Sequence, residues 1–377
     1  MITWETPIED FDSIEWDKLN GENLLTALEI YCTKKGASDI HTSPERSGVR
    51  LEIRLHGVLL PLMKLEHSAY EDFVRRIKFI SKLKLNITDT PQDGQYVCKA
   101  PDRIINIRVA SIPSKFGESF TLRLLDPKRG IVPLESLGFP KIIAEKFKEL
   151  VSMPHGLILV TGPTGSGKTT TLYALLNEIA EEQKNIITLE DPIEYELDGI
   201  VQTAVDPNHD YDFSNGLRSI LRQDPDVILV GEIRDVETAK TAINAALTGH
   251  LVLSTLHTNS AVEAIQRLLS MGVTNHTLAP ALKAVMGQRL VRTLKSKCKE
   301  PDSKCDPADH NSYDGVTAVP ELLIVNSEIE SEILNESSSE AIEKKIKESG
   351  YMTVKEWGQK LVKNGTTSQE EISRVMN

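Results

Sequence analysis

One glycine-rich segment limits what this chain can fold into more than any other feature. It fits the pattern G-x-x-x-x-G-K-[ST] of a phosphate-binding loop, or P-loop. Its eight residues are Gly162-Pro163-Thr164-Gly165-Ser166-Gly167-Lys168-Thr169. The apolar, β-branched run Leu157–Val160 precedes them, and Thr170–Ala180 follows with apolar residues at helical spacing. Strand, loop and helix in this order are the context that the motif requires, so we expect a nucleoside triphosphate to bind here.

The residue types of the loop suit a triphosphate bound together with Mg²⁺. Glycines let backbone N–H groups turn towards an anion, and a helix that begins near Gly167 adds the positive end of its dipole. Lys168 can reach the β- and γ-phosphates, and the Thr169 hydroxyl is an oxygen ligand for Mg²⁺. The alternative is a glycine-rich turn that binds nothing, which the flanking strand and helix disfavour. We therefore expect an ATPase with ATP and Mg²⁺ as cofactors, bound by residues 162–169 and Thr170.

Length and composition are those of an ordinary multidomain globular protein. The chain has 377 residues, which predicts two or three domains, with 40% hydrophobic and 26% charged residues. No apolar run is long enough to span a bilayer, and the start lacks the features of a signal peptide, so we expect a cytoplasmic protein. The net charge of −12 disfavours a protein whose main task is to bind nucleic acid.

The pattern of predicted elements divides the chain into five segments. Residues 1–20 are acidic and without periodicity, so we expect a flexible arm. Residues 21–125 predict a small α+β domain, and residues 126–140 are rich in proline and glycine, as is typical of a linker. Residues 141–295 alternate short strands with helices and predict a mostly parallel sheet. Residues 296–377 are expected to form a polar loop and a helical subdomain.

Individual elements follow from periodicity within these segments. We predict helices over Asn23–Lys34 and Ser68–Lys82, and a helical pattern throughout residues 260–295. The predicted strands include residues 49–55, 105–109, 120–124, 157–160, 186–189, 227–230 and 251–254.

Polar side chains follow three of the strands predicted in the second domain. Glu190, Asp191 and Glu194 come after the second strand, Glu232 after the third and His257 after the fourth. Because the carboxyl ends of parallel strands meet at one edge of a sheet, we expect these side chains to lie near the loop. Carboxylates there can hold Mg²⁺ through water or orient an attacking water. One such residue alone could cap a helix, but three sets in register with one loop are hard to explain as caps.

Taken together, these motifs resemble the secretion ATPases of type II secretion and type IV pilus assembly, the GspE/PilB type. The resemblance covers about residues 20–377. The matching segments are an aspartate box at 187–194, a Walker B region at 217–235, a histidine box at 248–258, and two motifs of the family's second amino-terminal domain at 37–41 and 91–94.

The resemblance implies an architecture and a setting. The fold class would be α/β, with a RecA-like P-loop domain built on a parallel sheet. A smaller α+β PAS-like domain would precede it, and a helical tail would follow. The motor would be a homo-hexamer with ATP between the two domains. Its partner would be a polytopic platform protein of the inner membrane, at whose cytoplasmic face the motor would lie peripherally, with no specific nucleic acid bound.

The resemblance also implies roles for particular residues. Glu232 would be the catalytic acid that polarises water, with Glu194 as the second candidate, and His257 would sense the γ-phosphate. The arginines that correspond to family arginines around the nucleotide are Arg108, Arg123, Arg218 and Arg222. An arginine fork neutralises charge that develops on the γ-phosphate. For Arg108 and Arg123 the alternative is the polar face of an exposed strand. The oxygen ligands expected for Mg²⁺, partly through water, are Thr169, Glu190 and Asp191.

The cysteines depart from the family pattern. Its assembly branch usually carries a paired CxxC zinc motif, whereas this chain has only Cys298 and Cys305, with His310 nearby. Structural zinc requires four ligands in tight geometry, so we predict no zinc and two free thiols. Cys32 and Cys98 fall in predicted elements and are expected to be small core residues. A second departure is that only a short acidic arm precedes residue 20, where assembly ATPases carry a further domain.

Several functions remain open within this resemblance. The first is a motor for pilus or pseudopilus assembly or for type II secretion, and residues 365–371 look like the tail of the assembly branch. The alternatives are a conjugation, DNA-uptake or pilus-retraction ATPase, and a scaffold that only binds nucleotide. The acidic balance disfavours DNA handling, and intact Lys168, Glu232 and His257 disfavour the scaffold.

Overall fold

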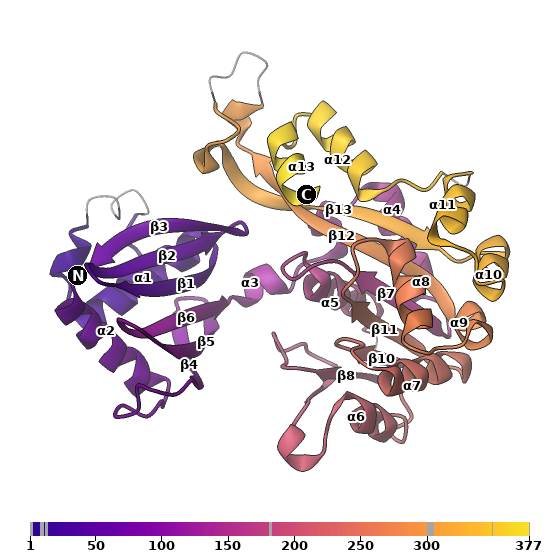
Figure 1. Ribbon diagram of the computed structural model, residues 1–377, viewed down its shortest axis with the longest axis horizontal. Coiled ribbons are helices and arrows are strands. Elements are labelled where there is room, and N and C mark those ends of the chain that lie inside the picture. Colours follow the sequence, from indigo (N-terminus) through magenta and orange to yellow (C-terminus); the bar gives the residue numbers. More distant parts are fainter. Residues whose placement is uncertain are drawn as a thin grey trace. The chain divides into compact units, whose positions relative to one another are not determined.

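The computed structural model describes residues 3–7, 11, 14–180, 183–299, 305–348 and 350–376 (Figure 1). The chain forms two compact units, Met1–Gly130 and Ile131–Asn377. Their boundary falls inside the glycine- and proline-rich stretch 126–140. Each unit combines helices with its own β-sheet, so the fold is α/β. No helix within the described ranges is long and apolar enough to cross a membrane.

The described part of the first unit is built on an antiparallel six-stranded sheet with two long helices, and the one-turn helix α3 (Pro127–Gly130) ends it. The strand order is β3-β2-β1-β6-β5-β4. Helices α1 (Gly21–Lys35) and α2 (His67–Ile80) pack against each other and share one core cluster with the sheet. The strands are β1 (Ala37–Glu45), β2 (Gly48–Leu55), β3 (Val58–Leu65), β4 (Gln92–Ala100), β5 (Arg103–Ser114) and β6 (Gly117–Leu125).

Alternation along β5 explains why one face of this sheet is covered. Ile105, Ile107 and Val109 are buried in the core beneath the helices, while the residues between them lie on the other face. An alternating strand buries one face and leaves the other free for polar side chains. Arg108 belongs to that second face.

Helix α1 has clear start and stop signals. The Asn20 side chain accepts a hydrogen bond from the N–H group of Asn23 at 2.9 Å, and Gly36 ends the helix in the left-handed conformation, with φ 76°. These are the caps that such residues usually form. The helix predicted over Asn23–Lys34 is therefore confirmed and begins two residues earlier.

The amino-terminal arm differs from the prediction of a flexible segment. Phe11 is buried, and its ring centroid lies 5.5 Å from that of Tyr31 on α1. Trp16 packs on the same tyrosine, at 5.8 Å. Aromatic rings bury large areas, so a few of them can hold a segment that lacks any helical periodicity. The parts of the predicted arm at 1–2, 8–10 and 12–13 lie outside the described residues.

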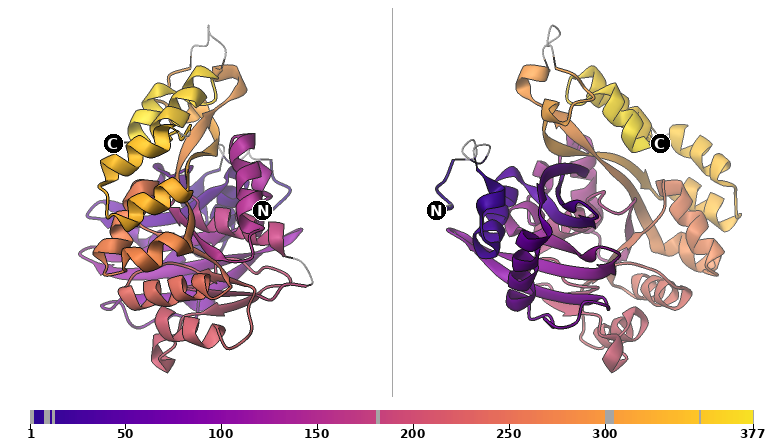
Figure 2. Two further views of the ribbon diagram at one scale, coloured as in Figure 1. Left: turned by 90° about the vertical axis from the view of Figure 1, so that its right-hand side faces the viewer. Right: turned by 60° about the vertical axis from the view of Figure 1, so that its left-hand side comes forward.

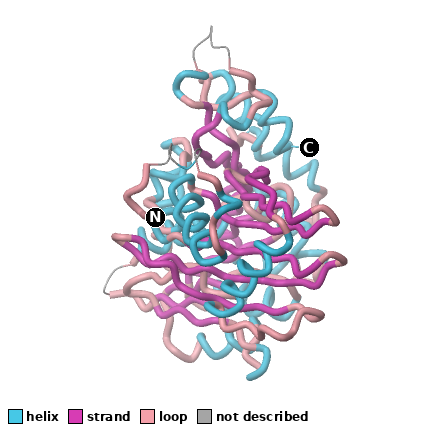
Figure 3. The backbone as a smooth tube through the Cα atoms, turned by 90° about the vertical axis from the view of Figure 1, so that its left-hand side faces the viewer, coloured by secondary structure: helices cyan, strands magenta, loops and turns pink. Residues whose placement is uncertain are grey.

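The second unit is built on a mixed seven-stranded sheet, seen in magenta with that of the first unit in Figure 3. The strand order is β13-β12-β7-β11-β10-β8-β9. The parallel strands are β7 (Gly156–Thr161), β8 (Ile186–Glu190), β9 (Val201–Ala204), β10 (Val227–Val230), β11 (Leu251–Leu256) and β12 (Leu282–Leu294), and the antiparallel one is β13 (Tyr313–Ile324).

Helices cover both faces of this sheet, and two core clusters result. Phe147 and Leu172 belong to one cluster, whereas Ile243, Leu268 and Leu278 belong to the other. The helices are α4 (Lys141–Val151), α5 (Lys168–Ile179), α6 (Phe213–Ile220), α7 (Val236–Leu247), α8 (Ala261–Ser270) and α9 (Asn275–Ala281). Strands buried on both faces read as continuous apolar runs, which is why β7, β8, β10 and β11 were visible in the sequence.

The helical prediction for residues 260–295 is wrong in its last part. Helices α8 and α9 lie there, but Leu282–Leu294 forms β12, a central strand beside β7. Ala284, Val285 and Met286 are all buried, so both faces of the strand are apolar. Periodicity alone cannot tell such a run from a buried helix. Its partner β13 extends the same sheet beyond residue 295, where we had expected a separate subdomain to begin.

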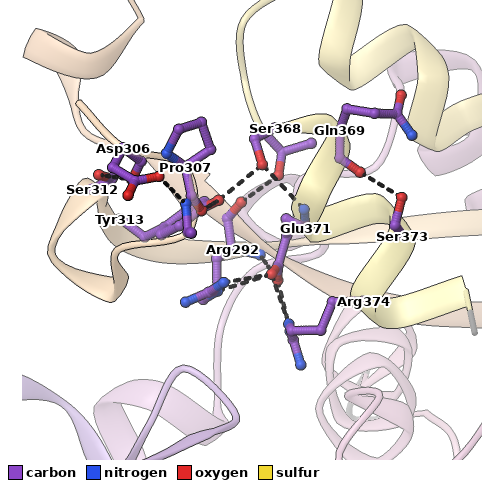
Figure 4. A network of polar contacts seen from close by, with 12 residues as sticks. Arg292, Asp306, Pro307, Ser312, Tyr313, Ser368, Gln369, Glu371, Ser373 and Arg374 are labelled. Carbon is purple, nitrogen blue, oxygen red and sulfur yellow. Dashed lines mark hydrogen bonds and ion pairs between the residues drawn. The ribbon is translucent and has the colours of Figure 1, made fainter. Parts of the chain in front are cut away.

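Among the described residues after β13 there are four short helices: α10 (Ser327–Leu334), α11 (Ser339–Glu348), α12 (Val354–Lys363) and α13 (Gln369–Met376). Helices α12 and α13 lie beside β12 and β13 (Figure 2). The side chain of Glu371 on α13 is fully buried and accepts hydrogen bonds from Arg292 of β12 and from Arg374 (Figure 4). The Arg292 guanidinium also lies 4.0 Å from the centroid of the Tyr313 ring. A buried, doubly paired carboxylate thus fastens α13 to the sheet.

The cysteines only partly follow the prediction. Cys32 and Cys98 are free and buried in the core of the first unit, as expected. Cys298 and Cys305 form a disulfide between β12 and β13, so the prediction of two free thiols is wrong. Their Cα atoms are 5.4 Å apart because both lie near the end of the same hairpin, a proximity that linear spacing did not reveal.

Candidate functional site

The glycine-rich loop joins β7 to α5, and its glycines have backbone angles that other residues rarely adopt. The φ angles of Gly162, Gly165 and Gly167 are 148°, 78° and 87°. A Cβ atom on Gly162 would lie 2.5 Å from the Gln288 carbonyl oxygen, and one on Gly167 would lie 2.8 Å from the Gln288 side-chain nitrogen. Two of the three glycines are thus required by packing as well as by conformation. Beyond them, the N–H groups of the first turn of α5 have no partners within the helix, which makes this an anion-binding end.

Lys168 lies over this loop. Its Nζ donates hydrogen bonds to the carbonyl oxygens of Gly162 at 2.9 Å and Pro163 at 3.1 Å. Burial lowers the pKa of Lys168, and the nearby negative charge of Glu232 opposes that shift. The two side chains are therefore close enough to interact across the loop. A cation here can meet the charge of a phosphate that the loop binds.

Charged side chains form a chain across the ends of the parallel strands. Glu232, just beyond β10, pairs with Arg234, and its Oε2 lies 3.4 Å from Nε2 of His257, just beyond β11. Arg234 Nη1 lies 3.3 Å from Oδ2 of Asp191, just beyond β8. The hydrogen bond that Arg234 donates to Glu232 raises the pKa of Arg234. Acid and base thus alternate along one edge of the sheet, at the end where α5 begins.

A threonine pair fixes the loop relative to the histidine segment. Thr161, the last residue of β7, donates a hydrogen bond from Oγ1 to the Leu256 carbonyl oxygen at 3.0 Å. The same hydroxyl accepts a hydrogen bond from the N–H group of Thr258, also at 3.0 Å. His257 lies between these two residues, so its backbone is held next to the start of the glycine-rich loop.

The acidic residues after β8 have different surroundings from one another. Glu190 is buried and accepts hydrogen bonds from Tyr173 and Thr188, while Asp191 is exposed and paired with Arg234. Glu194 is half-buried, and its N–H group donates to the Tyr173 hydroxyl at 3.4 Å. In the described part of the chain, no group of three or more histidine, cysteine, aspartate or glutamate residues is arranged to hold a metal ion.

Two of the four predicted arginines lie together. Arg108 on β5 and Arg123 on β6 are directly opposite each other in the antiparallel ladder, so they share one face of the first sheet. Arg123 Nε lies 2.9 Å from Oδ1 of the buried Asp39. The same aspartate has Arg54 within 3.8 Å. Asp39 therefore orients Arg123 on that face.

The other two arginines lie on or just after α6 and are largely exposed. Arg218 Nη2 lies 3.2 Å from Oε2 of Glu237 on α7. Arg222 donates hydrogen bonds to the Arg218 carbonyl oxygen and to Ser219 Oγ. These contacts join Arg218 and Arg222 to α6 and α7, and none of them is with the glycine-rich loop.

Sequence reasoning missed one residue that touches the loop directly. Gln288 on β12 is 1% exposed, accepts a hydrogen bond from Thr171 Oγ1 at 2.8 Å and donates one to the Ser166 carbonyl oxygen at 2.7 Å. Its only signal in the sequence is a polar side chain inside a long apolar run. Because that run was read as helical, the side chain could not be placed next to β7.

A mixed sheet with helices on both faces, a glycine-rich loop from a strand to a helix, and charged residues at the adjacent strand ends define an α/β protein of the P-loop class. Comparison with known families narrows this class. Residues 18–374 match the family model described as Type II/IV secretion system protein. The chain therefore belongs to that family, and the resemblance noted in its motifs is confirmed.

Individual relatives agree with this assignment. The chain is 42% identical to the Type II secretion system ATPase E of Vibrio cholerae and to the Type II secretion system protein E of Pseudomonas aeruginosa, each match covering 93% of this chain and 74% of the relative. Among solved structures it is similar to the pilus retraction motor PilT with bound ADP, with a TM-score of 0.66 and 27% identity, covering 95% of this chain and 97% of the other. The ATPase DotB of Legionella pneumophila shares the fold, with a TM-score of 0.73 and 22% identity over 94% of this chain and 95% of the other.

Proposed function

We propose that this chain is an ATP-hydrolysing motor of a type II secretion system or of pilus assembly. The observation that carries the proposal is that Lys168 lies on the glycine-rich loop after β7, while the paired Glu232 and His257 follow β10 and β11, the next two strands of the same sheet. The likeness to the Type II secretion system ATPase E of Vibrio cholerae supports both the activity and the system.

The loop and the start of α5 are the proposed phosphate-binding elements. The positive φ angles of Gly162, Gly165 and Gly167 let successive N–H groups face an anion, and no side chain of theirs stands in its way. The Ser166 hydroxyl is buried without a hydrogen-bond partner, so a polar group is still needed beside it. ATP supplies the phosphoryl group that is transferred to water. Lys168 would exchange its two carbonyl partners for phosphate oxygens, which are the stronger acceptors.

Glu232 is the side chain that we assign to polarise the attacking water. Its carboxylate lies at the end of β10, close enough to Lys168 to affect the pKa of that lysine. His257 and Arg234 hold the carboxylate from two sides and so fix its direction. A positioned carboxylate can take up part of the proton charge of a water in the transition state. Glu194, half-buried after β8, is the second candidate for this role.

For Mg²⁺ we propose Thr169 and Asp191 as the oxygen ligands, in part through water. The Thr169 hydroxyl lies in the first turn of α5, and Asp191 is exposed at the neighbouring edge of the sheet. Glu190 accepts hydrogen bonds from Tyr173 and Thr188 on its two oxygens, so we assign it a part only through water. Hard oxygen donors of this kind are the usual magnesium ligands.

Four arginines complete the proposed nucleotide site. We propose that Arg108 and Arg123 contribute cations to the nucleotide, which is supported by their lying side by side on one sheet face. Arg218 and Arg222 would join them only after leaving their present partners on α6 and α7.

At the level of the whole protein we propose a homo-hexamer at the cytoplasmic face of the inner membrane. Its first unit would be PAS-like, its second RecA-like with a helical tail, and its partner a polytopic platform protein, with no specific nucleic acid. The antiparallel sheet with α1 and α2, and the helices α10 to α13, support this domain description.

Two substitutions test the activity. Lys168→Ala should abolish measurable ATP hydrolysis, because the loop loses its cation. Glu232→Gln should keep ATP binding but lose turnover, since the amide cannot take up negative charge. ATP binding and single-turnover hydrolysis separate the two effects. Unchanged hydrolysis by Glu232→Gln would move the water-polarising role to Glu194, and hydrolysis by neither wild type nor variants would leave only a nucleotide-binding scaffold.

A pilus-retraction motor is the second candidate function. The observation that favours it is the likeness to the retraction motor PilT over 95% of this chain. Expression in a strain that lacks its own assembly ATPase separates the two, because an assembly motor restores extended pili or secretion and a retraction motor does not. Filter binding with single-stranded DNA tests the remaining conjugation or DNA-uptake alternative, and we expect no specific retention.

A further inference from the structure

Gln288 lies directly beside the glycine-rich loop because of the way β12 pairs with β7. In that parallel ladder Gly287 is opposite Thr161, the last residue of β7. The next residue on each strand is Gln288 on one side and Gly162 on the other. The missing side chain of Gly162 lets the Gln288 carbonyl approach to where a Cβ atom would be only 2.5 Å away. The backbone of Gln288 is therefore packed against the first residue of the loop.

The side chain of Gln288 makes one hydrogen bond to the loop and one to the helix. Its Nε2 donates to the Ser166 carbonyl oxygen at 2.7 Å, and its Oε1 accepts from Thr171 Oγ1 at 2.8 Å. Both bonds are buried. A neutral carboxamide donates and accepts from one planar group, so a single side chain satisfies both partners. Because the Ser166 carbonyl can only accept, the NH2 end of the amide must face the loop, and the Thr171 hydroxyl then donates to the amide oxygen.

The bond to Ser166 determines the direction of a peptide plane. The Ser166–Gly167 bond is not among the cis peptides of the described residues, so its C=O and N–H groups point to opposite sides. When the carbonyl points at Gln288, the N–H group of Gly167 points away from β12. Ser166 is flanked by Gly165 and Gly167, whose backbones rotate at little cost. Local chain stiffness therefore does little to stop this peptide from flipping.

We propose that Gln288 is a positioning residue that holds the Ser166–Gly167 peptide so that the Gly167 N–H group faces the phosphate of the bound nucleotide. This inference rests on the nucleotide site proposed above. In it, the Gln288 side chain on β12 keeps the loop peptide in the orientation that binds phosphate. Without the amide, the carbonyl of Ser166 can turn towards the phosphate side. There it would repel the anion that the N–H group attracts.

The test is the substitution Gln288→Met, which keeps the length of the side chain and removes both hydrogen bonds. The dissociation constant of a fluorescent ADP analogue should rise about 10- to 100-fold, as expected for one lost hydrogen bond to a charged group. The midpoint of thermal unfolding without nucleotide should fall by a few degrees. Because a merely structural role would lower stability alone, the nucleotide affinity is the decisive measurement.

The matched control is Gln266→Met. Gln266 on α8 is half-buried, and its Nε2 donates to the Ser337 carbonyl oxygen at 3.0 Å, so the same change removes the same kind of bond away from the loop. We expect it to lower the unfolding temperature and to leave ADP binding unchanged. Binding by Gln288→Met within twofold of wild type would overturn the inference while the proposed function stands. A wild-type chain that binds no nucleotide would instead remove the proposed function.

A structure of the wild-type chain with ADP gives a second test that needs no variant. It decides the matter if Gln288→Met does not fold. We expect Gly167 N within hydrogen-bond distance of a phosphate oxygen and Gln288 Nε2 still on the Ser166 carbonyl. A flipped Ser166–Gly167 peptide, or a broken Gln288–Ser166 bond beside a bound phosphate, would contradict the inference.

Discussion

At the scale of single residues, two acids at the edge of the second sheet, Asp191 and Glu232, each have a neighbouring base. Asp191 faces Arg234, which also pairs with Glu232, and Glu232 in turn approaches His257. Such pairs hold the carboxylates in fixed directions. The side chains that fix the loop from neighbouring strands are nevertheless uncharged: Gln288 bonds to the loop, and Thr161 bonds to Thr258 at its start. The charged residues at the strand ends supply the groups for catalysis, and neutral hydrogen bonds fix the conformation of the loop.

The arginines of the first unit give a prediction at this scale. Charge-assisted hydrogen bonds are worth about 1.5–3 kcal/mol each, so Arg108→Ala should reduce turnover roughly 10- to 100-fold if Arg108 reaches the γ-phosphate. ADP binding should change little, because ADP lacks that phosphate. Steady-state ATPase rates and ADP affinity, measured side by side, test this.

Arg50→Ala is the matched control, because Arg50 is an arginine on β2 of the same sheet whose partners are Glu45 and Glu52. We expect it to affect neither measurement. Equal, minor effects of Arg108→Ala and Arg50→Ala would make Arg108 an ordinary residue on the polar face of a sheet.

At the scale of elements, the attachment of α13 gives a prediction of stability. Burial raises the pKa of Glu371, but hydrogen bonds from Arg374 and Arg292 outweigh it, so the pKa in the folded protein is lowered. A lowered pKa adds stability that is fully present above the unfolded value near 4.5 and is lost as the pH falls through the folded value. Glu371→Gln should therefore cost about 3–5 kcal/mol at pH 7, because two arginines lose their counter-charge.

Denaturant titrations of wild type and Glu371→Gln between pH 7 and pH 3 measure this difference, which should shrink below pH 4.5 as wild-type Glu371 takes up a proton. Glu370→Gln, one residue earlier and exposed, is the control and should be neutral. A constant difference across the pH range would mean that packing, and not charge, makes the contribution of Glu371.

The same scale shows how far the sequence leads. The strands β7, β8, β10 and β11 were predicted from short apolar runs, and the loop between β7 and α5 was predicted from its glycines. Strand β12 was taken for a helix because its apolar run has no period of two. As a result, the contact of Gln288 with the loop and the Cys298–Cys305 disulfide were not predicted. Local patterns encode local conformation. Contacts such as Arg292 with Glu371 join residues 79 positions apart and leave no local trace.

At the scale of the whole molecule, the family assignment leads to a prediction of assembly. Bound nucleotide should favour the ring if residues from more than one copy contribute to one site, because a ligand stabilises the state that binds it better. Light scattering after gel filtration should show six times the chain mass of 41.9 kDa with a non-hydrolysable ATP analogue, and less without it. Lys168→Ala should show no such shift, since it lacks the cation that meets the phosphates.

A monomer mass for wild type under conditions where the analogue demonstrably binds would contradict that prediction. It would also show that a single chain binds nucleotide without assembling into a ring. This is possible because the glycine-rich loop, α5 and β12 all belong to one chain.

Strand β12 has a mechanical consequence. It carries Gln288, which touches the loop, and four residues later Arg292, which holds α13. Over that distance, about 13 Å along an extended chain, a hydrogen-bonded strand neither stretches nor shortens. The loop and α13 are thus both anchored to one short stretch of β12, the loop through Gln288 and α13 through Arg292. A substitution that shifts β12 along its own axis would therefore disturb both anchors together.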